Sequence, residues 1–185
     1  MWGLAVTQET RPAESTAERL RRAFDETFSV ATSAADTDVQ GLLCLGVRGE
    51  PYAVRLGEVT ALLADQKIVP LPGSSPELLG LTGVRGAVVP VYDLGGLLGL
   101  ARASQPPRFL VVAGELQSVG LSFERFDGYA RVQRSQISSA AADAARLHCR
   151  EVARVGPEAR AVVAVGSILD TITEKVAAMR ATRER

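Results

Sequence analysis

Residues 79–94 read LGLTGVRGAVVPVYDL, and this stretch decides most of what the sequence predicts about the fold. Two short apolar runs, 79–84 and 87–92, flank Arg85 and Gly86. Short strands joined by a glycine-containing tight turn are typical of hairpins in a β-barrel or sandwich. The glycines here do not form a phosphate loop: the Walker and dinucleotide patterns are absent, and the chain continues into a strand, not a helix.

The same pattern of short apolar runs continues on both sides of this hairpin. Runs rich in valine and leucine are broken by glycine and proline from residue 40 onward. We expect ten strands, at residues 42–47, 52–56, 68–71, 79–84, 87–92, 109–113, 118–123, 129–132, 151–155 and 161–165. The sequence therefore predicts a mainly β fold, and the helical spacing of residues 168–180 adds a C-terminal helix.

The first 38 residues differ from the rest of the chain. Leu20, Phe24 and Phe28 fall on one face at helical spacing, and Ser15 with Glu18 forms a capping-box pattern. We therefore expect an N-terminal extension, 1–38, that contains an amphipathic helix. The β domain, with two sub-barrels, is expected over residues 39–180, and a frayed tail over 181–185.

Composition and charge exclude several classes of function. Hydrophobic residues make up 46% of the chain, and 21 basic side chains balance 21 acidic ones. Zero net charge and 5% aromatic residues offer neither an attraction for phosphates nor stacking platforms, so no contact with nucleic acid is expected. Residues 1–10 lack a signal-peptide pattern, and no apolar run reaches the roughly 18 residues of a membrane span. We expect a cytoplasmic protein that does not insert into a membrane.

Residues suited to catalysis or metal binding are scarce. His148 is the only histidine, and Cys44 and Cys149 are the only cysteines, without Cys-x-x-Cys spacing. No nucleophile motif accompanies the histidine, so we expect no enzyme, no metal and no other cofactor. Arg85 is the remaining candidate: a turn arginine is either a solvated side chain or a rigidly presented binding group with five donors.

Residues 79–94 strongly resemble the central signature of the CheW family of chemotaxis coupling proteins. In that signature Arg-Gly is followed by a variable residue, two apolar residues and proline, and then by Asp-Leu after two more apolar residues. The matching residues are Gly80, Arg85, Gly86, Pro90, Asp93 and Leu94. The resemblance extends over about 41–175 and is most specific in the middle third.

The resemblance implies two packed five-stranded SH3-like β-barrels with no catalytic activity. It implies a cytoplasmic adaptor at receptor clusters that joins the helical hairpin of a methyl-accepting chemoreceptor to the regulatory domain of a CheA-type histidine kinase. Self-association is a further implication. By position, the implied receptor-binding residues are Val59, Leu62, Val84, Arg85 and Gly86, while Gly80, Pro90, Asp93 and Leu94 are implied to be structural.

The sequence departs from the family pattern at several positions, and at three of them a usual polar or charged side chain is missing. Ala61 replaces a usual glutamate, Gly83 replaces asparagine, and Gly95 replaces arginine. These changes remove polar and charged contacts and leave two alternatives. One is an accessory adaptor that binds the receptor but recruits a partner other than the kinase. The other, in a different class, is a β-barrel that binds a small molecule.

Overall fold

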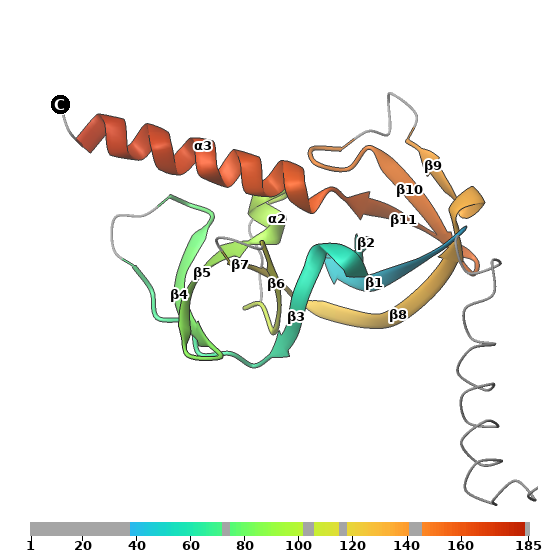
Figure 1. The fold of residues 1–185 in the computed structure, drawn as a ribbon, viewed down its shortest axis with the longest axis horizontal. Helices are drawn as coiled ribbons and strands as arrows, with labels where there is room; N and C mark the ends of the chain where they lie inside the picture. Colours follow the sequence, from blue (N-terminus) through green and yellow to red (C-terminus); the bar gives the residue numbers. More distant parts are fainter. Residues whose placement is uncertain (1–37, 72–74, 102–105, 115–117, 141–145, 184–185) are drawn as a thin grey trace, which may run out of the picture. The chain divides into compact units, whose positions relative to one another are not determined.

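The computed structural model describes residues 38–71, 75–101, 106–114, 118–140 and 146–183. The chain divides after Asp38 into two units, and the second unit, from Val39, carries the fold described below. The amphipathic helix expected within 1–38 lies outside the described residues. In Figure 1 the second unit consists of two curled β-sheets and a long C-terminal helix.

The first sheet is built from the two ends of this unit. Its six strands, in spatial order, are β8 (Arg125–Gln133), β1 (Val39–Val47), β2 (Glu50–Arg55), β11 (Glu158–Val163), β10 (Glu151–Val155) and β9 (Ile137–Ser139). Neighbours are antiparallel except β2 and β11. Arg48 and Gly49 connect β1 to β2, and their φ angles of 55° and 83° are those of a two-residue hairpin loop.

The second sheet comes from the middle of the chain. Its five strands, in spatial order, are β3 (Val59–Ala64), β6 (Phe109–Ala113), β7 (Val119–Phe123), β5 (Ala87–Asp93) and β4 (Leu78–Val84). The segment after β3 covers the outer edge of β4. Val69 and Leu81 exchange backbone hydrogen bonds of 2.8 and 2.9 Å, and the Thr82 hydroxyl donates to the Lys67 carbonyl at 2.9 Å. This segment joins the two edges of the sheet, so the sheet closes on itself.

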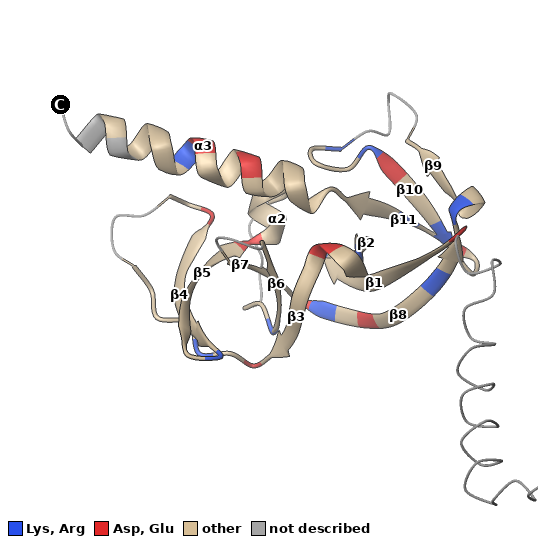
Figure 2. Ribbon diagram, viewed as in Figure 1, with Lys and Arg blue, Asp and Glu red and all other residues tan. Residues whose placement is uncertain are grey.

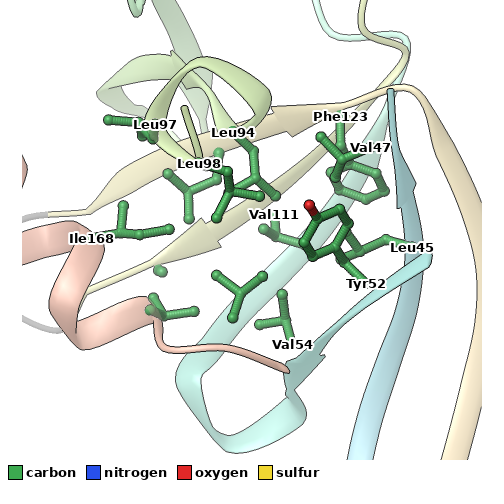
Figure 3. Close-up of a cluster of buried hydrophobic side chains, with 14 of the residues drawn as sticks. Leu45, Val47, Tyr52, Val54, Leu94, Leu97, Leu98, Val111, Phe123 and Ile168 are labelled. Atoms are coloured by element: carbon green, nitrogen blue, oxygen red, sulfur yellow. The ribbon is translucent and has the colours of Figure 1, made fainter. Parts of the chain in front are cut away.

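Several strands are buried on both faces. In β1, Leu42 packs inside the first sheet, whereas Leu43 packs between the two sheets. In β6, Leu110 packs inside the second sheet and Val111 between the sheets. Strands buried on both faces have continuous apolar sequences, which explains the valine- and leucine-rich runs seen in this chain. Figure 3 shows part of the cluster between the sheets, including Leu45, Tyr52, Val54, Leu97 and Phe123.

Short helical segments link the strands, and a long helix ends the domain. They are η3 (Leu56–Glu58), α2 (Leu94–Leu97), η4 (Arg134–Gln136) and α3 (Val165–Arg183). Ile168 and Ile172 of α3 are buried in the cluster between the sheets. Lys175 of α3 donates to Glu77, just before β4, at 2.5 Å, and this hydrogen bond lowers the pKa of the Glu77 carboxyl. The helix is thus anchored to the second sheet.

The expected mainly β fold, with two packed β-sheets and a C-terminal helix, is confirmed, with differences in detail. The first sheet has six strands and not five, because β9 adds to β10. Residues 68–71, expected to be a strand, form a single bridge at Val69, since Pro70 lacks a backbone donor. The helix expected to end at about 180 continues to Arg183.

Three elements were not anticipated as such. No strand was expected at β3, which lies between two of the predicted strands, and β9 is only three residues long. The short helix α2 contains Gly95 and Gly96, which have low helix propensity. It forms because the Asp93 carboxylate accepts from the backbone amide of Gly96 at 3.2 Å, which caps the helix.

Candidate functional site

Arg85 and Gly86 form the two-residue turn between β4 and β5, as the sequence predicts. Their φ angles are 50° and 84°, and Val84 pairs with Ala87 on either side. Two positive φ angles are the mark of a type I′ turn, whose twist matches that of the strands. Glycine adopts such angles without strain, whereas for arginine they cost about 1 kcal/mol. Arg85 therefore occupies a position that its own backbone disfavours.

The Arg85 side chain is exposed, and it has no hydrogen bond or ion pair within the described residues. The turn that carries Arg85 is held by apolar packing inside the second sheet. Val84 is 9% exposed and packs inside the second sheet with Val89. Val84 was expected to face a partner, but in the structure it holds the turn in place. The guanidinium is thus presented to solvent from a rigid hairpin.

The two expected residues of β3 lie apart from this turn. Val59 and Leu62 are half-buried and pack against the cluster between the sheets. The end of β3 nearer the turn is Ala64, because the segment that follows it pairs with β4. At about 3.3 Å per residue, Val59 lies roughly 16 Å from that end. Only a long partner could contact both Val59 and Arg85.

Gly80 has a structural reason to be glycine. Its φ is 150°, and an added Cβ would lie 2.1 Å from the Val69 carbonyl oxygen, which belongs to the segment that covers the edge of β4. A side chain at this position would push that segment away. Pro90 stands one residue before Val91, where the pairing of β5 with β7 begins, so its missing donor falls outside that pairing.

Asp93 and Leu94 join the two sheets. Leu94 is fully buried between them. The Asp93 carboxylate accepts from the Arg48 guanidinium at 2.5 Å, and Arg48 also forms an ion pair with Glu124. The Glu124 carboxylate accepts from the Arg48 backbone amide at 3.1 Å, and Arg48 Nε donates to the Ala101 carbonyl at 2.8 Å. Arg48 thus ties the β1–β2 turn to the end of β5.

The Arg48 guanidinium lies directly over Gly95. A Cβ at this position would be 2.6 Å from Cζ of Arg48 and 2.7 Å from Nη2. Any side chain at 95 would therefore require the Arg48 guanidinium to shift. The departure from the family pattern at Gly95 and the presence of Arg48 are linked by this contact.

Comparison with known proteins identifies the family of this domain. Residues 41–171 match the CheW-like domain. The chain belongs to the CheW-like family. The chemotaxis protein CheW of Bacillus subtilis (strain 168) is 30% identical over 96 residues, which are 51% of this chain and 62% of that protein. The alignment therefore spans less than two thirds of that relative.

A solved structure agrees with the fold. The scaffolding protein TtCheW from Thermoanaerobacter tengcongensis has a TM-score of 0.61 at 16% identity, over 67% of this chain and 88% of that chain. At this identity the likeness shows a shared CheW-like fold. The resemblance that the signature indicated is thus confirmed by sequence and by structure.

The sole histidine, His148, is half-buried and contacts the start of α3. His148 Nδ1 lies 2.8 Å from the Ser167 hydroxyl, and buried Nε2 has no hydrogen-bond partner among the described residues. Burial, and then the charge of Lys175, lower the pKa of His148. Burial raises the pKa of the neighbouring Cys149 thiol to about 11, which keeps it protonated near neutral pH.

The described ranges contain no group of three or more histidine, cysteine, aspartate or glutamate side chains placed to hold a metal ion. No helix within them is both long and apolar enough to cross a bilayer.

Sequence reasoning missed two features of the site. Val88, inside the apolar run of the signature, is 72% exposed and not buried. The ion pairs of Arg48 with Asp93 and Glu124 were not anticipated either. The shared Arg-Gly dipeptide at 48–49 and 85–86 was the available signal that two like turns exist. It did not indicate which arginine would be paired.

Proposed function

We propose that this chain is a non-catalytic adaptor of a bacterial chemosensory pathway. It binds the cytoplasmic helical hairpin of a chemoreceptor and links it to a CheA-type histidine kinase, and its place is the cytoplasm at receptor clusters. Membership of the CheW-like family supports this function. So do the names of its relatives, one a chemotaxis protein and the other a scaffolding protein.

The observation that carries the proposal is the exposed Arg85. A guanidinium held on a rigid turn, without an acidic partner among the described residues, is ready to pair with a carboxylate of another protein. Gly86 permits the turn, and Val84 supports it from inside. Val59 and Leu62 form a second contact region along β3, which a receptor hairpin is long enough to reach.

Capture on an immobilised receptor hairpin tests the receptor contact. Arg85→Ala is expected to weaken binding at least tenfold without lowering stability, because the side chain makes no contact within the described fold. Arg154→Ala is the matched control: Arg154 is another exposed arginine without a described partner, on β10 of the first sheet. Equal loss of binding in both variants would contradict a specific role for Arg85.

The same assay tests the link to the kinase. Kinase that is retained on the receptor hairpin only when this chain is present supports coupling. A chain that binds the receptor but retains no kinase would instead support the accessory adaptor, whose second partner is a different protein. A receptor hairpin that captures neither would contradict the proposed function as a whole.

A further inference from the structure

The outer face of the β4–β5 hairpin, beside Arg85, is apolar and uncovered by the described residues. The inward-facing residues of the hairpin are Thr82, Val84, Val89 and Val91, all of them buried. Strand alternation turns the intervening residues outward. These are Leu81 and Gly83 on β4, and Val88 and Pro90 on β5.

The strand register places these residues in rows. Leu81 lies opposite Pro90 and beside Val69, which is 54% exposed. In the next row Gly83 lies opposite Val88, the most exposed large apolar side chain among the described residues. Residues directly opposite on one face have Cβ atoms about 5 Å apart. The rows therefore form one continuous apolar surface that ends at the Arg85 turn.

Gly83 leaves this surface open in its middle. A Cβ added there would meet no atom within 4 Å. Val88 borders the open position on one side. Lys67 borders it on the other, because the bridge at Val69 and the hydrogen bond from Thr82 to the Lys67 carbonyl set the register of this segment. The open position is thus bounded by one apolar and one cationic side chain.

The charge around this surface is positive. Lys67 and Arg85 are exposed and have no acidic partner among the described residues. The nearby Asp65 is already paired with Arg108, at 3.1 Å. In Figure 2 the β4–β5 turn is blue, and the strands behind it are tan. An approaching carboxylate would meet two cations that nothing in the described fold neutralises.

We propose that this face receives one helix of the partner, with a large apolar side chain at Gly83 against Val88 and with carboxylates at Arg85 and Lys67. The three adjacent segments span about 10 Å, which matches the diameter of an α-helix. This inference rests on the proposed function, because the helix is that of the receptor hairpin. It assigns the apolar part of the contact to the outer face of β4 and β5.

Filling the open position is the direct test. Gly83→Leu has room in the domain, so its unfolding midpoint is expected to stay at the wild-type value, while its affinity for an immobilised receptor hairpin falls at least tenfold. Val88→Ser is expected to weaken binding about fivefold, through loss of the apolar contact. The matched control is Gly166→Leu, at an exposed glycine of α3 with equally open surroundings, and it should bind like wild type.

The outcomes separate this inference from the function on which it rests. Wild-type binding that is weakened by Arg85→Ala but unchanged by Gly83→Leu and Val88→Ser would overturn the inference and leave the receptor function standing. Absence of receptor binding by the wild type would overturn both. Equal weakening by Gly83→Leu and Gly166→Leu would also overturn the inference, because the effect would not be specific to this face.

Discussion

The β1–β2 and β4–β5 turns have the same sequence and backbone conformation but opposite surroundings. Arg48-Gly49 has φ angles of 55° and 83°, and Arg85-Gly86 has 50° and 84°. The Arg48 side chain is only 13% exposed and forms ion pairs with Asp93 and Glu124. Arg85 is exposed and has no such pair among the described residues. The same local structure therefore holds one arginine, Arg48, in ion pairs within the fold and leaves the other, Arg85, exposed to solvent.

The difference shows that the role of a turn arginine is decided by long-range neighbours. Both arginines bear the strain of a positive φ, about 1 kcal/mol each. Arg48 offsets it with charged hydrogen bonds in a partly buried setting, where each is worth about 1.5–3 kcal/mol. Arg85 gains nothing comparable within the described fold. This uncompensated strain is a reason to test the proposed contact of Arg85 with a partner.

The same substitution at both turns should give opposite changes in stability. Asparagine tolerates positive φ better than arginine, so Arg85→Asn is expected to raise the free energy of unfolding by about 0.5 kcal/mol. Arg48→Asn is expected to lower it by about 2–3 kcal/mol, because Asp93 and Glu124 lose their common cation. Urea unfolding of both variants and the wild type measures the difference.

The control is Arg154→Asn, at an exposed arginine within β10, where the residue is not in a turn. It should change the free energy of unfolding by less than about 0.5 kcal/mol. If Arg48→Asn were as harmless as this control, the Arg48 ion pairs would be unimportant for stability and the contrast between the turns would disappear.

The fold was largely predictable because its signals are local. Apolar runs in both sheets, the Arg-Gly turns and the C-terminal helical spacing are each read within about ten residues. The failures have local causes too. Pro70 left only a bridge where a strand was expected, and helix α2 depends on its Asp93 cap more than on propensity.

The site was predictable only in part, because its decisive contacts join distant positions. Arg48 is 45 residues from Asp93 and 76 from Glu124 in the sequence. No local pattern links them. The exposure of Val88 could not be read either, since the valines at 88 and 89 look alike in sequence and face opposite sides of the strand. The roles of Arg85, Val59 and Leu62 in binding stay predictions.

Gly95 offers a way to perturb one turn and not the other. Gly95→Ala would place a methyl group 2.6 Å from Cζ of Arg48, so the guanidinium must shift relative to its carboxylates. We expect a net loss of about 1 kcal/mol, even though alanine favours helix α2 by up to that amount. In an Arg48→Ala background the same change should become neutral or stabilising. Urea unfolding of the four proteins gives the coupling energy.

If the stability changes caused by Gly95→Ala and Arg48→Ala were additive in this double-mutant cycle, Gly95 and Arg48 would not interact. The Arg85 turn supplies the reference: Gly95→Ala combined with Arg85→Ala should be additive within about 0.5 kcal/mol, because the described structure shows no contact between the two.

The two turn glycines test whether the backbones are truly alike. An added Cβ meets no atom within 4 Å at Gly49 or at Gly86, so only backbone strain opposes alanine. Each substitution to alanine should lower the free energy of unfolding by about 1 kcal/mol. The two losses should agree within about 0.5 kcal/mol. A clearly larger loss for Gly49→Ala would show that moving this turn also disturbs the Arg48 ion pairs.

Salt should affect the two arginines differently, and this is the smallest expected effect. The Debye length falls from about 10 Å at 0.1 M to 3 Å at 1 M, and exposed charges are screened far more than partly buried ones. Raising NaCl from 50 to 500 mM should therefore weaken wild-type capture by the receptor hairpin about threefold, and should weaken Arg85→Asn less. The stability difference between wild type and Arg48→Asn should change by less than about 0.5 kcal/mol over the same range. If instead salt reduced that difference and left receptor binding unchanged, the assignments of the two arginines would have to be exchanged.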